Sequence, residues 1–193
     1  MLCGGLSKRM GRDKASLPFG DETLLARVVR IVRGVVDEVV VVAAQDQTLP
    51  TLPDDVIVAR DEVLAKGPLG GLAPGLGAST ADAVFATGCD VPFLVPAFVE
   101  LLFERLGDAE IAVAETEGFV HPLAAVYRTR VLANVRRLLA SERLRPVFLY
   151  DEVLTTRVDE ETLRVVDPEL ASLENLNTPE AYEAALARCG GDR

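Results

Sequence analysis

The chain begins with a loop rich in glycine and in cationic side chains, Leu2-Cys3-Gly4-Gly5-Leu6-Ser7-Lys8-Arg9-Met10-Gly11-Arg12-Asp13-Lys14. Three glycines, one hydroxyl and four cationic side chains fall within these thirteen residues. Glycines let the backbone approach a ligand and expose N–H groups to anions. Lysine and arginine add charge-assisted hydrogen bonds to phosphate oxygens. The loop lacks the Gly-Lys-Ser/Thr of a Walker A motif, so it predicts another kind of phosphate-binding loop.

Strand-length apolar runs alternate with helix-length amphipathic segments through the rest of the chain. The predicted strands are 38–43, 56–59, 83–87, 110–114 and 123–127, and the predicted helices are 23–33, 95–106, 128–140 and one that starts at 179. This alternation predicts right-handed crossovers and a mostly parallel sheet with helices on both faces. Ligands of such sheets bind at the carboxyl ends of the strands, so we expect the functional residues there.

The overall composition favours one acidic globular domain that covers residues 1–193. Apolar residues make up 49% of the chain, the net charge is −10 and the pI is about 4.7. This charge argues against nucleic acids and anionic membranes as partners. However, the first twenty residues carry four cations against Asp13, a net +3, so the remainder carries −13. A single small polyanion can therefore still bind at the start of the chain.

The cysteines and the lack of long apolar stretches predict a cytoplasmic location. Cys3, Cys89 and Cys189 are odd in number and widely spaced, which favours neither a zinc site nor a disulfide framework. The chain shows no run of 18 apolar residues and no signal-peptide pattern at its start. We expect a reducing compartment and no membrane span.

Asp90 is the strongest candidate metal ligand. It follows the buried strand 83–87 directly, where a carboxylate has no packing purpose. Mg²⁺ takes one or two carboxylates together with phosphate oxygens and water. The alternative is that Asp90 caps the predicted helix 95–106.

Four segments, taken together and in order, resemble the molybdenum cofactor guanylyltransferase family, the MobA-like NTP transferases. They are the loop 2–14, Asp61 upstream of Gly67-Pro68-Leu69-Gly70-Gly71-Leu72, Cys89-Asp90-Val91-Pro92-Phe93, and Asn175-Leu176-Asn177-Thr178-Pro179-Glu180. The resemblance implies a single Rossmann-like α/β domain of three α/β/α layers with a mostly parallel mixed sheet, as in nucleotide-diphospho-sugar transferases. It also implies that residues 1–90 form mainly a nucleotide-binding half and 91–193 mainly an acceptor-binding half.

The activity implied by this resemblance is transfer of GMP from GTP to the molybdopterin cofactor, with release of pyrophosphate and a requirement for Mg²⁺. Transient contacts with molybdenum-cofactor biosynthesis proteins or target apoenzymes are also implied. Gly4-Gly5 looks like the guanylyl branch, whereas cytidylyl relatives typically carry Ala-Gly there. Two alternatives stay open: a related nucleotidyltransferase that uses CTP or another phosphorylated acceptor, and a catalytically impaired nucleotide-binding homologue.

The resemblance also assigns roles to individual residues. The nucleotide contacts would be Leu2, Cys3, Gly4, Gly5, Ser7, Lys14, Asp61, Gly70 and Asp90. The catalytic groups would be Arg9 and Lys14, which neutralise the phosphates, and Asp90, which holds the metal. Asn175 and Asn177 would lie on the acceptor or metal side, and His121 would line the acceptor pocket, a structural role being the alternative for His121.

The chain departs from the family pattern at two places. Only Met1 precedes Leu2, where relatives have several apolar residues that form the first strand. We therefore expect a truncated first strand and a natural start farther upstream. The stretch Val42-Ala43-Ala44-Gln45 also lacks the Asn that many relatives carry there to read guanine.

Overall fold

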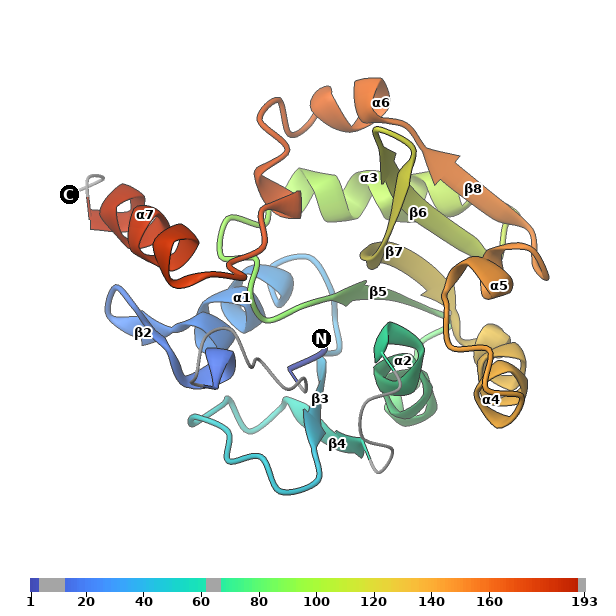
Figure 1. The fold of residues 1–193 in the computed structure, drawn as a ribbon, viewed down its shortest axis with the longest axis horizontal. Helices are drawn as coiled ribbons and strands as arrows, with labels where there is room; N and C mark the ends of the chain where they lie inside the picture. Colours follow the sequence, from blue (N-terminus) through green and yellow to red (C-terminus); the bar gives the residue numbers. More distant parts are fainter. Residues whose placement is uncertain (4–12, 62–66, 191–193) are drawn as a thin grey trace.

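The computed structural model describes residues 1–3, 13–61 and 67–190 and shows an α/β fold (Figure 1). Its larger strands are β3 (Val40–Ala44), β4 (Ile57–Asp61), β5 (Ala83–Thr87), β6 (Ile111–Thr116), β7 (Phe119–Arg128) and β8 (Thr155–Val158). β3 pairs with β4, and the other four follow the order β5-β7-β6-β8. A short hairpin, β1 (Pro18–Phe19) and β2 (Glu22–Thr23), lies outside these two sheets.

Residues 1–3 join the two sheets. Leu2 forms parallel bridges to Val42 of β3 and to Gly88 just after β5. The Leu2 N–H donates to the Thr87 carbonyl at 2.8 Å, and the Cys3 N–H donates to the Val42 carbonyl at 2.8 Å. The sheets therefore continue into one another in the order β4-β3-(1–3)-β5-β7-β6-β8, with the predicted truncated strand at the centre.

The continuous sheet is mixed and mostly parallel, as predicted. β3 runs parallel to β4, β6 runs parallel to β8, and both bridges of Leu2 are parallel. Only β7 runs antiparallel to its neighbours, β5 and β6. Because β5 and β6 are both antiparallel to β7, their carboxyl ends lie at the same edge of the sheet as that of β3.

Helices cover both faces of this sheet and complete the three predicted layers. One apolar cluster joins the sheet to α1 (Leu24–Val32) and α3 (Pro96–Leu106), and a second joins it to α2 (Gly67–Ala78), α4 (Leu132–Ala140) and α5 (Val147–Tyr150). A smaller cluster packs α7 (Pro179–Gly190) against the β1–β2 hairpin. No helix in the described part of the chain is both long and apolar enough to cross a membrane.

Most predicted elements lie within a few residues of the observed ones, but β7 starts four residues before the predicted strand 123–127, and α4 starts four residues after the start of the predicted helix 128–140. α1 begins after Thr23, whose hydroxyl accepts from the Ala26 N–H, and α7 begins after Thr178, whose hydroxyl accepts from the Ala181 N–H. The hairpin, α5, β8 and α6 (Glu160–Arg164) were not predicted. β8 reads Thr-Thr-Arg-Val, and an edge strand with so few apolar residues leaves no clear periodicity.

Candidate functional site

Three polar side chains from distant parts of the chain meet near the carboxyl ends of the central strands. The Lys14 Nζ lies 2.7 Å from Asp90 Oδ2 and 2.8 Å from Asn177 Oδ1. All three residues were predicted as site residues, and the structure brings them together. We call Lys14, Asp90 and Asn177 the polar cluster.

Asp90 is held at this position by its backbone and by a glycine before it. Its carbonyl accepts from the Leu176 N–H at 2.9 Å, which ties the strand end to the C-terminal segment. A Cβ atom on Gly88 would lie 2.5 Å from Asp90 Oδ1, so a side chain at residue 88 would displace the carboxylate. The cap position of α3 is Val95, five residues after Asp90, and no side chain caps this helix end. The alternative role of Asp90 as a helix cap is therefore wrong.

Lys14 begins a 3₁₀ turn, Lys14–Ser16, which is capped by Asp13. The Asp13 carboxylate accepts from the Ala15 N–H at 3.0 Å, and Ala15 itself is fully buried. The capped turn therefore holds the backbone of Lys14 against the body of the protein.

Gln47 contacts the chain on both sides of residues 4–12, although the sequence did not indicate it. Its Nε2 donates to the Cys3 carbonyl at 3.2 Å and to Asp13 Oδ1 at 2.9 Å. Its Oε1 accepts from the Ala44 N–H at 3.1 Å. The sequence indicated only that the stretch Val42-Ala43-Ala44-Gln45, just before it, lacks the Asn that many relatives carry there. The only signal for Gln47 was its place in a short polar turn after a buried strand.

The C-terminal segment that carries Asn177 is organised by a buried carboxylate. Asp167, only 2% exposed, accepts from the backbone N–H groups of Ala171 and Ser172 at 2.9 and 2.8 Å. The Ser172 hydroxyl in turn accepts from the Val95 N–H at 2.9 Å, which attaches this segment to α3. The Asn175 side chain donates back to the Leu173 carbonyl, so Asn177 is the asparagine that joins the polar cluster.

Four other predicted nucleotide contacts can be placed. Leu2 and Cys3 lie at the carboxyl edge of the central strands, and Gly70 is buried within α2. Asp61 is the last residue of β4, opposite Ala44, rather than part of a loop after that strand as predicted. The predicted residues Gly4, Gly5, Ser7 and Arg9 lie outside the described residues.

Two buried cysteines with free thiols lie near the site. Cys3 and Cys89 lie side by side as neighbours of the bridged pair Leu2 and Gly88, and both are buried. A hydrogen bond with Cys3, together with burial, raises the pKa of the Cys89 thiol well above its usual range. Both cysteines are thus packed as small buried residues at this end of the sheet.

His121 lies on β7, toward the same edge of the sheet. Ala124 pairs with Thr87, and His121 lies three residues farther along β7 in the direction of that edge. Its Nε2 is 2.7 Å from the Thr116 hydroxyl across the β6–β7 hairpin, and burial lowers the pKa of its imidazole. His121 thus lies at the same edge of the sheet as the polar cluster, and its hydrogen bond to Thr116 joins β6 and β7.

The polar cluster combines a carboxylate, an amide oxygen and an ammonium group. The Asp90 and Lys14 side chains are 17% and 14% exposed, so a ligand can reach both. Within the described residues, no group of three or more His, Cys, Asp or Glu side chains could hold a metal ion. A cation at Asp90 would therefore need oxygen atoms from a ligand as well.

Comparison with known proteins gives the family. The family described as "MobA-like NTP transferase domain" matches residues 1–155. A probable molybdenum cofactor guanylyltransferase of Methanosarcina acetivorans is 34% identical over 99% of this chain and 90% of its own length. Another from Mycobacterium bovis is 37% identical over 96% of this chain and 91% of its own.

A solved structure has the same fold. Molybdopterin-guanine dinucleotide biosynthesis protein A of Archaeoglobus fulgidus superposes with a TM-score of 0.78, at 20% identity, over 98% of this chain and 97% of its own. With a family match over most of its length and relatives above 30% identity over nearly all of it, the chain belongs to the MobA-like NTP transferases.

Proposed function

We propose that this protein is a molybdenum cofactor guanylyltransferase that transfers GMP from GTP to the molybdopterin cofactor and releases pyrophosphate. The observation that carries the proposal is the polar cluster at the carboxyl edge of the sheet, in a chain whose relatives bear that name. Ligands of open α/β sheets bind at this edge, and the cluster supplies groups suited to phosphates and to a cation.

Nucleotidyl transfer depends on positioning and on neutralising charge. In our proposal the Lys14 ammonium binds the β- and γ-phosphates and stabilises the negative charge that develops on the departing pyrophosphate. In the structure this ammonium is held by the oxygens of Asp90 and Asn177. Phosphate oxygens would compete for it and leave those two oxygens available to another cation.

The residues present fit a Mg²⁺ ion. Asp90 offers a carboxylate and Asn177 an amide oxygen, and both are hard oxygen ligands. Together with phosphate oxygens of the nucleotide they would hold the ion, which supplies charge neutralisation at the transferring phosphoryl group. Asp90 and Asn177 would thus serve the cation, while Lys14 serves the phosphates.

The acceptor would bind on the side formed by the C-terminal half. Asn177 comes from residues 91–193, whereas Lys14 comes from residues 1–90, so the cluster lies where the two proposed halves meet. His121 lies at the same edge and would line the acceptor pocket. We place the protein in the cytoplasm, where reduced thiols such as Cys3 and Cys89 persist, in transient contact with cofactor-biosynthesis proteins or target apoenzymes.

The test is pyrophosphate release measured with GTP or CTP, each with and without molybdopterin and Mg²⁺. We expect release only with GTP, molybdopterin and Mg²⁺ together. Release with CTP in place of GTP would instead identify a cytidylyltransferase. GTP binding without turnover would identify an impaired homologue, and either result would reject the proposal.

Single substitutions test the roles in the cluster. We expect Lys14→Ala and Asp90→Ala each to lower the rate of pyrophosphate release by about 10²-fold or more, the size typical for a lost transition-state contact. The matched control is Arg33→Ala, which breaks an exposed ion pair with Asp55 and should leave the rate unchanged. A nearly normal rate in Asp90→Ala would remove the metal assignment.

A further inference from the structure

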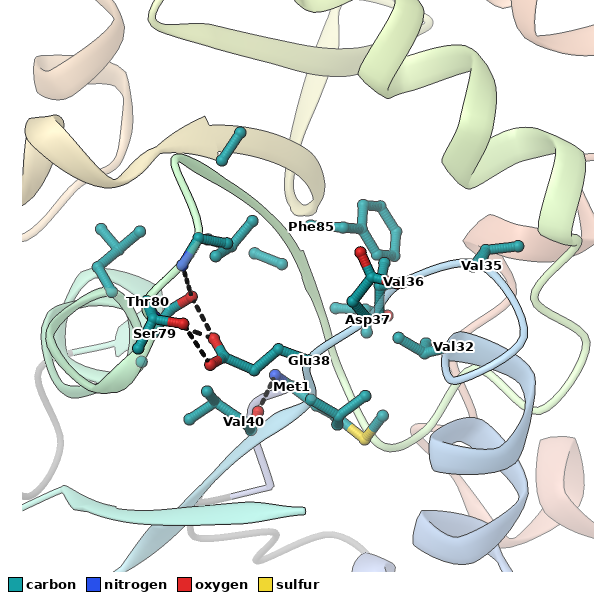
Figure 2. A pocket seen from close by; sticks show the side chains of 18 of the residues that line it. Met1, Val32, Val35, Val36, Asp37, Glu38, Val40, Ser79, Thr80 and Phe85 are labelled. Carbon is teal, nitrogen blue, oxygen red and sulfur yellow. Dashed lines mark hydrogen bonds between the residues drawn. The ribbon is translucent and has the colours of Figure 1, made fainter. Parts of the chain in front are cut away.

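The segment of β7 that carries His121 and an apolar cavity in the sheet lie at opposite edges of the sheet. The cavity has a volume of about 490 Å³ and lies between the amino ends of β3 and β5 (Figure 2). The described residues that line it come from residues 1–2, from α1, α2, α3, β3 and β5 and from the segments next to them, and none belongs to β7. The part of β7 near the carboxyl edge is therefore separate from this cavity and lies at the edge that carries the candidate site.

β7 has a long bulge at the carboxyl edge of the sheet. β6 pairs Val113 with Ala125 and then Glu115 with Val120. One residue of β6 therefore lies opposite the four residues 121–124 of β7, three more than a regular ladder would place there. We call residues 121–124 the bulge, and it contains the only histidine of the chain. Bulges next to functional sites often redirect a side chain, so we asked what holds this one in place.

A tyrosine farther along β7 binds the bulge. The Tyr127 hydroxyl donates to the Pro122 carbonyl at 2.9 Å, although the two residues are five positions apart. In a regular strand five residues span about 16 Å, which is farther than a tyrosine side chain reaches. The hydrogen bond can form only because the bulge folds back over the face of the sheet on which Tyr127 lies. The Tyr127 hydroxyl thus holds the bulge in this folded-back conformation.

A second hydroxyl completes the contact, and chemistry fixes the direction of donation. The Tyr127 oxygen is also 3.1 Å from the Tyr150 hydroxyl. A carbonyl oxygen only accepts, so the single hydroxyl proton of Tyr127 is donated to Pro122. Tyr150 must then donate to Tyr127, which has no second proton. Of the two hydroxyls, that of Tyr127 therefore contacts the bulge, and that of Tyr150 supports it from α5.

Both phenols are buried and keep their protons. Tyr127 is fully buried in the apolar cluster that joins the sheet to α2, α4 and α5, and Tyr150 is the last residue of α5. Burial raises the pKa of the Tyr127 phenol well above its ordinary value, and burial raises the pKa of Tyr150 to about 12. Tyr127 is therefore a permanent donor to Pro122 at neutral pH.

His121 is held by two contacts of different kinds. Its imidazole Nε2 lies 2.7 Å from the Thr116 hydroxyl on β6. Its backbone directly precedes Pro122, whose carbonyl is bound by Tyr127. The first contact restrains the ring and the second restrains the backbone that carries it. The position of the imidazole therefore depends on both.

We propose that Tyr127 is a positioning residue, whose hydroxyl holds the bulge so that His121 is placed at the acceptor side of the candidate site. The contact between Tyr127 and the bulge rests on geometry alone, whereas the identity of the acceptor, molybdopterin, rests on the proposed function. Because Tyr127 is fully buried, it acts on the acceptor through Pro122 and His121 and not by contact.

The test compares Tyr127→Phe with its matched control, Tyr150→Phe. Each variant removes one oxygen from the same buried pair of hydroxyls, so each is expected to lower the Tm. Only Tyr127→Phe removes the donor to Pro122. Because His121 is the only histidine, its imidazole gives one set of NMR signals, and their titration measures its pKa in each variant.

We expect Tyr127→Phe to move the pKa of the His121 imidazole up toward the ordinary value of 6.5, because a loosened bulge admits water to the ring. We expect Tyr150→Phe to leave this pKa unchanged, because Tyr127 still donates to Pro122. An unchanged pKa in Tyr127→Phe would overturn the proposal. So would equal changes in both variants, since they would show a role in packing that the two hydroxyls share.

Steady-state kinetics of pyrophosphate release then connects the contact to the acceptor. We expect Tyr127→Phe to raise the KM for molybdopterin about fivefold or more, the size of a lost buried hydrogen bond, and to leave the KM for GTP unchanged. An unchanged KM for molybdopterin in a variant with an altered His121 would overturn the acceptor-side role. If the wild-type protein shows no turnover, the proposed function fails, while the titration of His121 still decides whether Tyr127 positions it.

Discussion

One side chain, that of Gln47, attaches the backbone on both sides of residues 4–12. It binds the Cys3 carbonyl before them and the Asp13 carboxylate after them. Arg60 holds the turn that carries Gln47 by donating to the carbonyls of Ala44 and Gln47 itself. Gln47 therefore holds Cys3 and Asp13, the described residues on either side of 4–12, and in the proposed function we expect it to influence the nucleotide only through them.

Replacing Gln47 by Glu should weaken nucleotide binding more than it slows turnover. The carboxylate cannot donate to Cys3 and repels Asp13. We expect the KM for GTP to rise about tenfold, which corresponds to about 1.4 kcal/mol, with a smaller change in kcat. Steady-state kinetics measures both constants, and Thr51→Glu adds the same charge at an exposed residue as a control. A lower kcat at constant KM would contradict the positioning role.

His121 should make the stability of the protein depend on pH. Burial lowers the pKa of its imidazole below the ordinary value of 6.5, so the unfolded chain binds the proton more readily than the folded protein does. Stability is therefore lost as the pH falls through 6.5 toward the lower pKa of the folded state. Urea unfolding at about pH 7.5 and 5.5 should show a larger loss for the wild-type protein than for His121→Gln. Equal losses would show that the imidazole is not held in its neutral form.

At the scale of elements, α2 packs closely on the centre of the sheet because it is rich in glycine. Gly71 faces Leu2, and Gly75 faces Val42, where a Cβ would lie 3.2 Å from the Val42 Cγ2. This close approach lets a helix with little side-chain volume cover residues 1–3 at the centre of the sheet. It also explains why two glycines lie in the middle of a helix, where they normally lower stability.

Two substitutions in the same helix separate packing from helix propensity. Gly71→Ala should destabilise the fold by about 1–3 kcal/mol, because the new Cβ overlaps Leu2. Gly77→Ala should be neutral or stabilise by up to about 1 kcal/mol, because nothing lies within 3.5 Å of its Cβ. Denaturant unfolding gives both free energies. Adding Leu2→Ala should remove part of the penalty of Gly71→Ala, and strict additivity would argue against direct contact.

At the scale of the whole molecule, the sequence indicated the apolar strands of the sheet best. The strand 83–87 was predicted to the residue, because it is a continuous run of mostly apolar residues with Asp82 before it and Gly88 after it. β8 and the β1–β2 hairpin were missed, because short edge strands owe their conformation to tertiary pairing more than to local pattern. Lys14, Asp90 and Asn177 were predicted from motifs that lie next to turns and strand ends. Gln47 was missed, because its role arises only when residues 3, 13 and 44 come together.

The candidate site includes residues that lie beyond the end of the family match. The matched domain ends at residue 155, where β8 begins, yet Asn177 and the segment organised by Asp167 lie beyond it. Leu176 also donates to the carbonyl of Asp90. The last part of the chain thus completes the candidate site, and a protein cut at residue 155 would lose one of the three cluster side chains.

The burial of the Met1 amino group has a practical consequence for protein production. Because the Met1 amino group is buried and donates to the Val40 carbonyl, a purification tag fused there would alter a contact at the centre of the sheet. A tag placed after α7 leaves the sheet untouched and is the better choice for comparing variants.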